Sequence, residues 1–183
     1  MHASKHIDVI GLLGPLRRYA RSLTRDNAQA DDLVQDALVH AYERQGSFSA
    51  SGNLKGWLLS ILHNAFIDER RRSTAERQRL EHLAQISDSL MPADQEGRVR
   101  LQQIQRAFLA LPEEQRAALH LVAIEGLSYQ EAAESLGIPV GTLMSRLGRA
   151  RAALRAFEAG QGLLQIGAEK TRPNLRVVGG SHD

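Results

Sequence analysis

Residues 128–154 read SYQEAAESLGIPVGTLMSRLGRARAAL, and this stretch decides the fold of its half of the chain. Ser128 stands three residues before Glu131, the spacing of a capping box, so a helix is expected to begin directly after Ser128. Gly137 can end that helix in the left-handed conformation without a Cβ clash, and Pro139 suits the first turn of the next helix. Two helices joined by a short turn that contains glycine predict a helix-turn-helix.

The second of these helices has two different faces. Its inward stripe is apolar and consists of Val140, Leu143, Leu147, Ala150 and Leu154. Its outward stripe is polar, at the spacing i, i+3, i+4 and i+7, and consists of Thr142, Ser145, Arg146 and Arg149. Such a face fits the DNA major groove, while Arg151 and Arg155 further along suit phosphates. The alternative is an ordinary amphipathic helix with solvated or glutamate-paired arginines, and the cap, the glycine turn and the separated faces together favour DNA binding.

The rest of the chain also has helical periodicity, with no sustained alternation typical of strands, so the fold class is all-α. Glycine and serine in residues 46–56 predict a loop, and Ser73 with Glu76 could cap a further short helix. We expect two small helical domains, at 1–74 and 98–158, with a flexible linker at 75–97 and a flexible tail at 159–183. Helices are expected over 7–23, 28–44, from 53–57 to 72, 99–111, and 112–126.

Charge is distributed unevenly along the 183 residues, although the net charge is only +2. Arg70 to Arg72 form one basic cluster, and the arginines of the second helix form another. Between the clusters lies an acidic stretch, opposed in sequence only by Arg116, that consists of Glu113, Glu114, Glu125, Glu131 and Glu134. Because positive and negative side chains are segregated along the sequence, we expect two basic surfaces on a protein whose charges otherwise nearly cancel.

Several classes of protein are not supported. The absence of cysteine excludes disulfides and thiolate metal sites. No apolar run approaches the roughly 20 residues of a membrane span, and residues 1–14 lack the features of a secretory signal. Because there is no glycine-rich phosphate loop and the histidines are scattered, we expect no enzymatic activity, no metal and no cofactor.

Three segments together carry a resemblance to a known family. They are QADDLVQDALVHAYER at 29–44, NLKGWLLSILHNAFIDERRR at 53–72, and LPEEQRAALHLVAIEGLSYQEAAESLGIPVGTLMSRLGRAR at 111–151. In this order and spacing, which spans about residues 8–157, the chain resembles the extracytoplasmic-function group of bacterial sigma factors. The resemblance implies a sigma domain 2 and a sigma domain 4, joined by a linker.

The resemblance also implies partners. The helix at 29–44 would contact the clamp helices of the polymerase β′ subunit through Asp31, Asp32, Gln35 and Asp36. Taken alone, without the resemblance, these residues favour a solvated acidic face near a helix N-terminus. The other implied partners are the β flap of the polymerase, promoter DNA and an anti-sigma factor.

Residues 46–56 and the helix from Trp57 match the family segments that open the −10 element and hold an extruded base. The candidates for base contact are Phe48, Ser49, Asn53, Lys55 and Ser60. Asn64, Arg70, Arg71 and Arg72 are candidates for the DNA backbone. Trp57 and Phe66 fall on the apolar stripe of this helix, and we expect them to be core residues.

In the second half, the helix at 140–155 would recognise the −35 element through Thr142, Met144, Ser145, Arg146, Arg149 and Arg151. Two positions depart from the family pattern. Met144 stands where many relatives have arginine or lysine, and Gly148 stands where relatives often have a larger residue. The methionine could shift base preference or weaken the contact with DNA.

The function that the resemblance implies is that of an alternative sigma factor in the cytoplasm, without direct membrane insertion. It would act in a stress or envelope response under the control of an anti-sigma factor. Two alternatives stay open, a sigma-like module that sequesters an anti-sigma factor and a helix-turn-helix regulator that acts without polymerase. A sequestering module usually lacks basic residues at the DNA-binding positions. A regulator that acts without polymerase would leave the resemblance at 29–72 unexplained.

Overall fold

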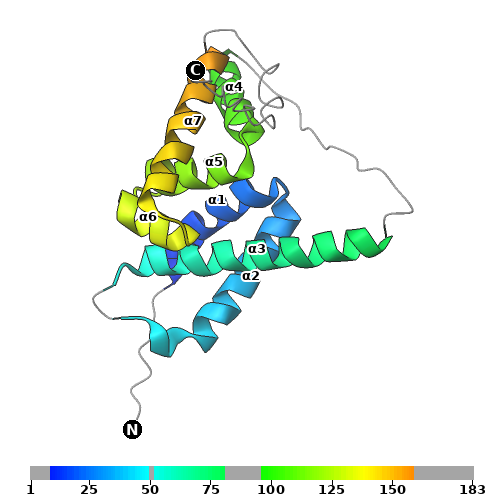
Figure 1. Cartoon of the computed structure of the whole chain (residues 1–183), viewed down its shortest axis with the longest axis vertical. Helices are drawn as coiled ribbons and strands as arrows, with labels where there is room; N and C mark the ends of the chain where they lie inside the picture. Colours follow the sequence, from blue (N-terminus) through cyan, green and yellow to red (C-terminus); the bar gives the residue numbers. More distant parts are fainter. Residues whose placement is uncertain (1–8, 50–51, 81–95, 159–183) are drawn as a thin grey trace, which may run out of the picture.

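The computed structural model describes residues 9–49, 52–80 and 96–158, and within them every regular element is a helix. The N-terminal module comprises η1 (Ile10–Leu12), α1 (Leu13–Thr24), α2 (Asn27–Glu43), η2 (Gln45–Ser47) and α3 (Leu54–Leu80). The C-terminal module comprises α4 (Glu96–Ala110), α5 (Glu113–Leu119), η3 (His120–Ile124), α6 (Tyr129–Leu136) and α7 (Val140–Glu158). Figure 1 shows α1 and α2 against α3, with α5 beside α1, α6 beside the start of α3, and α7 beside α5 and α6. The all-α prediction is confirmed.

Helices α1 and α2 are joined by a tight corner. Arg25 ends α1 in the left-handed conformation, with φ of 61°. Asp26 then caps α2, because its side chain accepts a hydrogen bond of 2.8 Å from the backbone nitrogen of Gln29. The corner turns α2 back along α1, so that both helices pack on α3.

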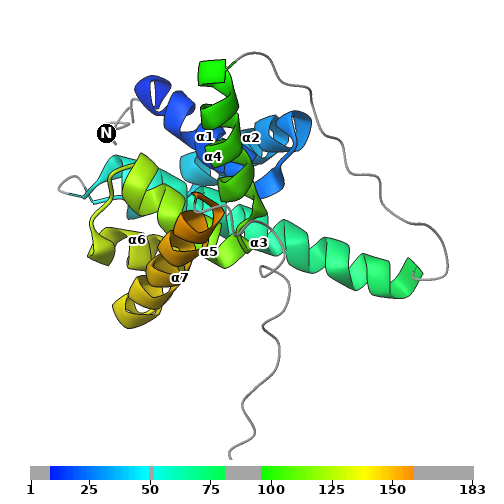
Figure 2. The same ribbon diagram turned by 90° about the horizontal axis from the view of Figure 1, so that it is seen from above.

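Helix α3 is longer than the sequence pattern indicated. The interpretation of Ser73 as the cap of a separate helix is wrong, because α3 continues through Leu80 and the Ser73 hydroxyl donates to the carbonyl of Arg70. Residues 73–80 contain alanine, glutamate, glutamine and arginine, which sustain a helix once it has begun. Figure 2 shows the end of α3 projecting beyond the other helices. Of the linker expected at 75–97, residues 75–80 and 96–97 are helical, in α3 and α4. Its residues 81–95 and the tail expected at 159–183 lie outside the described residues.

The buried apolar residues of the two modules form one continuous cluster. Leu16, Leu59 and Leu62 come from the N-terminal module, and Leu121 and Leu143 come from the C-terminal module. All five side chains are at most 1% exposed. Contacts of α1 with α5 and of α3 with α6 join the modules. The modules therefore share a core, which suits two units too small to bury a large core alone.

Candidate nucleic-acid interface

The helix-turn-helix has the local geometry that its sequence predicted. The Ser128 hydroxyl accepts from the backbone nitrogen of Glu131, and the Glu131 carboxylate accepts from the backbone nitrogen of Ser128 at 2.8 Å. Gly137 ends α6 with φ of 62°. A non-glycine residue at Gly137 would be strained in this left-handed conformation. The capping box and the glycine turn are thus confirmed.

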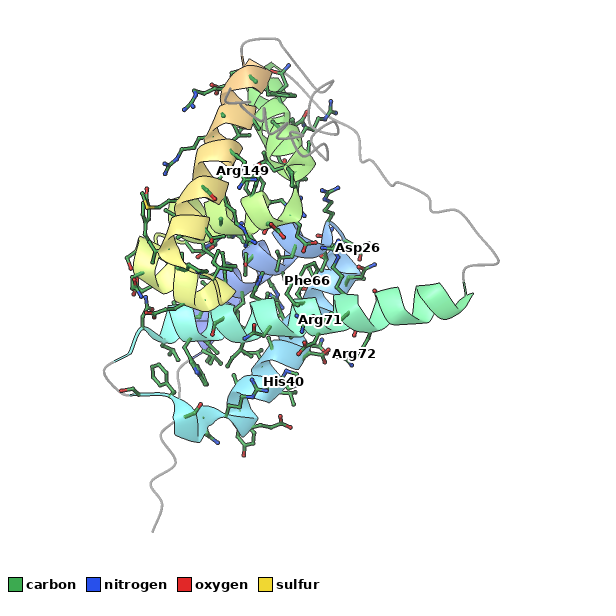
Figure 3. The ribbon with its side chains drawn as sticks, viewed as in Figure 1. Asp26, His40, Phe66, Arg71, Arg72 and Arg149 are labelled. Atoms are coloured by element: carbon green, nitrogen blue, oxygen red, sulfur yellow. The ribbon has the colours of Figure 1, made fainter. Side chains whose placement is uncertain are left out.

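The two faces of α7 are also confirmed. Leu143, Leu147 and Ala150 are at most 1% exposed, and Val140 and Leu154 pack at the edge of the core. Of the predicted −35 residues, Met144, Ser145, Arg149 and Arg151 are exposed, and Thr142 is half-buried. Figure 3 shows Arg149 on α7, well separated from Arg71 and Arg72 on α3. An exposed helix face with arginine, serine and threonine can donate to base edges and phosphates.

Arg146 differs from its neighbours on that face. Its Nη2 atom lies 2.9 Å from Oε2 of Glu114, at the start of α5, and its side chain is only 20% exposed. Arg149 instead donates to the hydroxyl of Ser145 one turn earlier, at 3.3 Å. Arg151 donates to the hydroxyl of Tyr129 on α6 at 3.4 Å. Arg149 and Arg151 are therefore more open to a ligand than Arg146, and Arg155 further along α7 is also exposed.

A pocket of about 340 Å³ lies beside the loop between α2 and α3. Four of the predicted −10 residues line it, namely Phe48, Ser49, Asn53 and Ser60. The rings of Phe48 and Trp57 lie 5.1 Å apart at an angle of 42°, and Trp57 lines the pocket while its other side packs on the core. The expectation that Trp57 and Phe66 are core residues holds only in part, because both are half-buried.

The C-terminal module closes one side of this pocket with Glu131, Glu134 and Ser135 of α6. The amide of Asn53 donates to Oε1 of Glu131 at 2.7 Å, and the Ser135 hydroxyl donates to the carbonyl of Gly56 at 3.2 Å. Hydrogen bonds from Asn53 and Ser128 lower the pKa of Glu131 to about 2, so this carboxylate is ionised at neutral pH.

The remaining backbone candidates lie along α3. Asn64 is exposed, and Arg70 pairs with Glu113 of α5. Arg71 and Arg72 pair with acidic residues one turn earlier on α3, at 3.8 and 3.7 Å, and their side chains are 78% and 71% exposed. Such exposed pairs contribute little to stability, so both arginines remain available to phosphates.

The predicted polymerase contacts lie on α2. Asp32, Gln35 and Asp36 are exposed, whereas Asp31 is half-exposed and lies 3.4 Å from Nε of Arg17. Two large apolar side chains on the same helix, Val39 at 57% and Tyr42 at 74%, are also exposed. Neither was among the residues predicted from the sequence. Val39 follows Gln35 by four residues and Asp36 by three, and Tyr42 follows Val39 by three, a spacing that could have indicated a shared face.

The acidic stretch differs in exposure along its length, because Glu125 is buried and Glu113 and Glu131 are half-buried. Arg116 is 2% exposed, and its guanidinium donates to the carbonyls of Ser22, Leu109 and Leu111. Burial lowers the pKa of Arg116 to about 10, which leaves the guanidinium charged at neutral pH. Arg116 therefore joins α5 to the carboxyl end of α1.

Glu125 is the most deeply buried carboxylate of this stretch, with a side chain 1% exposed. Its Oε1 atom lies 3.2 Å from Nη2 of Arg18 and 3.3 Å from Nε2 of His120. The ammonium of Lys55, a predicted −10 residue, lies 3.9 Å from its Oε2 atom and also donates to its backbone carbonyl. Two cations of the N-terminal module thus surround a carboxylate of the C-terminal module.

His63 and His120 both lie next to Tyr19, where the two modules meet. Nδ1 of His63 is hydrogen-bonded to the Tyr19 hydroxyl at 3.0 Å, and the rings of Tyr19 and His120 lie 5.1 Å apart. Burial lowers the pKa of both histidines to about 4, so both are neutral at neutral pH. Within the described part of the chain, Nδ1 of His120 is buried without a hydrogen-bond partner, which disfavours its protonation.

Among the described residues, no three side chains of histidine, cysteine, aspartate or glutamate are grouped so that they could hold a metal ion. In the same residues, no helix combines the length and apolar character needed to cross a membrane.

Comparison with known families identifies both halves of the chain. The family model for sigma-70 region 2 matches residues 11–76, and the model for sigma-70 region 4 matches residues 101–154. Together the two matches define the class of sigma-70-type proteins.

Individual relatives narrow this class. The chain is 34% identical to the ECF RNA polymerase sigma factor EcfG of Rhodopseudomonas palustris, over 95% of this chain and 94% of the relative. It is 39% identical to the ECF RNA polymerase sigma factor SigM of Mycobacterium tuberculosis, over 76% of this chain and 69% of the relative. The solved structure of the sigma factor RpoE of Bartonella quintana, in complex with the anti-sigma factor NepR, matches with a TM-score of 0.71 and 36% identity. That match covers 82% of this chain and 94% of the other. The chain therefore belongs to the extracytoplasmic-function (ECF) group of RNA polymerase sigma factors.

Proposed function

We propose that the chain binds core RNA polymerase and directs it to promoters that contain a −10 and a −35 element. The single observation that carries this proposal is the exposed polar face of α7, present in a chain that also matches sigma-70 region 2. A helix-turn-helix alone would support only DNA binding. The match to sigma-70 region 2 also supports binding to polymerase and to a second promoter element.

Each exposed surface has a proposed role. The exposed face of α2 with Asp31, Asp32, Gln35 and Asp36 binds the β′ clamp helices, and the C-terminal module binds the β flap. Met144, Ser145, Arg149 and Arg151 face the −35 element, with Thr142 at the edge and Arg146 held by Glu114. The −10 element contacts the pocket residues Phe48, Ser49, Asn53 and Ser60, with Lys55, Asn64 and Arg70 to Arg72 alongside.

We further propose that an anti-sigma factor controls the chain, in a stress or envelope response. The support is its 36% identity to a sigma factor whose solved structure contains an anti-sigma factor. Action with core polymerase would place the protein in the cytoplasm.

Run-off transcription with core polymerase and a promoter library tests the proposal. The wild-type chain should give transcripts that core polymerase alone does not give. Gln35→Ala with Asp36→Ala should abolish stimulation and binding to core polymerase, while Glu43→Gln on the same helix should not. Absence of any stimulated transcript would contradict the proposal. Binding to an anti-sigma factor without transcription would instead identify a sequestering module.

A further inference from the structure

Met144 is an exposed apolar side chain on a helix whose other exposed residues are polar or small. It is 54% exposed and lies in the second turn of α7, which begins at Val140. In a helix-turn-helix, the N-terminal residues of the second helix contact base edges in the major groove. Met144 therefore belongs to the part of α7 that would lie against bases.

Two glycines leave the Met144 side chain uncovered. Gly141 lies three residues before it and Gly148 four residues after it, so all three share one side of α7. The space that a Cβ atom would fill at either glycine is open. Because helical side chains lean toward the helix N-terminus, a larger residue at position 148 would cover Met144. The glycines on both neighbouring turns thus leave the thioether open to a partner.

The surroundings of Met144 fit DNA as this partner. From Val140 to Phe157, α7 contains four arginines and no acidic residue. Ser145 and Arg149 lie on the outward face of the helix, and the guanidinium of Arg149 donates to the Ser145 hydroxyl at 3.3 Å. Such side chains suit phosphates and guanine edges. Met144 has neither a charge nor a hydrogen-bond donor, so its contact with DNA must be of another kind.

We propose that Met144 selects thymine at one position of the −35 element by packing on the C5-methyl group of that base. This inference rests on the proposed function, because it uses the assignment of α7 to the −35 element. The thymine methyl is the apolar group that base pairs present in the major groove. A flexible, unbranched methionine can fit against it, and both groups then lose their contact with water.

Helix geometry predicts where this thymine lies. Met144 and Arg149 are five residues apart, which is about 7.5 Å along the axis of an α-helix. Successive base pairs of B-form DNA are about 3.4 Å apart. The thymine that Met144 contacts should therefore lie within about three base pairs of the base that Arg149 contacts.

Selection from a promoter library identifies the position. Holoenzyme assembled from core polymerase and the full chain selects duplexes with a randomised −35 element, and Arg149→Ala shows which position depends on that arginine. Met144→Ala should lose the preference for thymine at one nearby position and keep the other preferences. Met144→Leu, which keeps an apolar side chain, should retain the thymine preference. Both Met144 substitutions are neutral, so the electrostatic attraction of DNA is the same in all three proteins.

Removal of a single methyl group tests the contact itself. Deoxyuridine replaces the selected thymine in a fluorescein-labelled promoter duplex, and holoenzyme binding is measured by fluorescence anisotropy. The replacement should weaken binding by the wild type about three- to fivefold, as expected for one buried methyl group. It should leave the affinity of Met144→Ala unchanged. Ile104→Ala, which removes an apolar side chain 43% exposed on α4, is the matched control and should show the full methyl effect.

Three results contradict the proposal. The first is an unchanged −35 preference in Met144→Ala, and the second is an equal deoxyuridine effect in wild type and Met144→Ala. The third is an equal loss of affinity by Met144→Ala for every promoter, which would assign the side chain to a protein contact. If wild-type holoenzyme selects no promoter at all, the proposed function fails and this proposal fails with it. Selected promoters with any of the three results reject the methyl contact alone.

Discussion

The guanidinium of Arg146 lies 2.9 Å from the carboxylate of Glu114, and this contact joins the recognition helix α7 to the start of α5. Arg149 is exposed and donates to the hydroxyl of Ser145. We therefore expect Arg149→Ala to weaken −35-dependent promoter binding about tenfold or more, as for an arginine that contacts a base. Arg146→Ala should weaken it less and should lower the free energy of unfolding. Promoter titration with holoenzyme and urea denaturation measure the two effects; equal losses of affinity would contradict the assignment.

A substitution at Met144 should raise promoter affinity instead of lowering it. Its side chain is 54% exposed beside Ser145 and Arg149 on α7. Met144→Arg should raise promoter affinity and steepen the dependence of log K on log salt by about one unit, because one more phosphate contact becomes available. Ile104→Arg is the matched control, since Ile104 is 43% exposed on α4 and the substitution adds the same charge away from α7. The same salt slope in both variants would place Met144 outside the DNA contact.

The shared core predicts that both modules unfold together. Trp57 is the single tryptophan and lies in the N-terminal module, whereas Leu121 is fully buried in the C-terminal module. Leu121→Ala should cost about 2–5 kcal/mol and should shift the urea midpoint of Trp57 fluorescence together with that of far-UV circular dichroism. An unchanged Trp57 midpoint would show that the modules unfold independently.

The two histidines beside Tyr19 predict loss of stability in acid. Burial lowers the pKa of His63 and His120 from about 6.5 to about 4, so the unfolded chain binds more protons than the folded chain between these pH values. The free energy of unfolding should therefore fall as the pH drops from 6.5 to 4, by up to about 1.4 kcal/mol per pH unit for each histidine.

Urea denaturation at a series of pH values measures this slope. His120→Gln should reduce it, whereas His40→Gln, on α2 and outside the junction, should leave it unchanged. An identical slope in wild type and His120→Gln would show that His120 contributes nothing to the acid sensitivity.

The sequence predicted the parts of the interface that depend on neighbouring residues. The cap of α6 uses Ser128 and Glu131, its end uses Gly137, and the buried stripe of α7 has a period of three and four residues. Each of these signals lies within one or two helical turns, where backbone geometry and side-chain spacing decide the structure.

Contacts between the modules could not be predicted in this way. Arg18 and Glu125 are 107 positions apart, and Arg116 reaches the carbonyl of Ser22 across 94 positions. The partners of these residues depend on how the two helical modules pack. The local sequence around an acidic residue is the same whether its side chain faces solvent or a buried arginine. The sequence pattern therefore did not indicate that Glu113, Glu125 and Glu131 bind the other module.

The contact between the two modules depends on the number of residues in the π-helix η3. In η3 the backbone nitrogen of Glu125 bonds to the carbonyl of His120, five residues earlier, which is one residue more than an α-helical turn uses. Deletion of one residue within 120–124 would favour an ordinary α-helical turn and rotate the chain beyond it by about 100°. Glu125 would leave Arg18 and Lys55, and α6 and α7 would turn with it. In this short segment, a one-residue deletion should thus be far more damaging than most single substitutions.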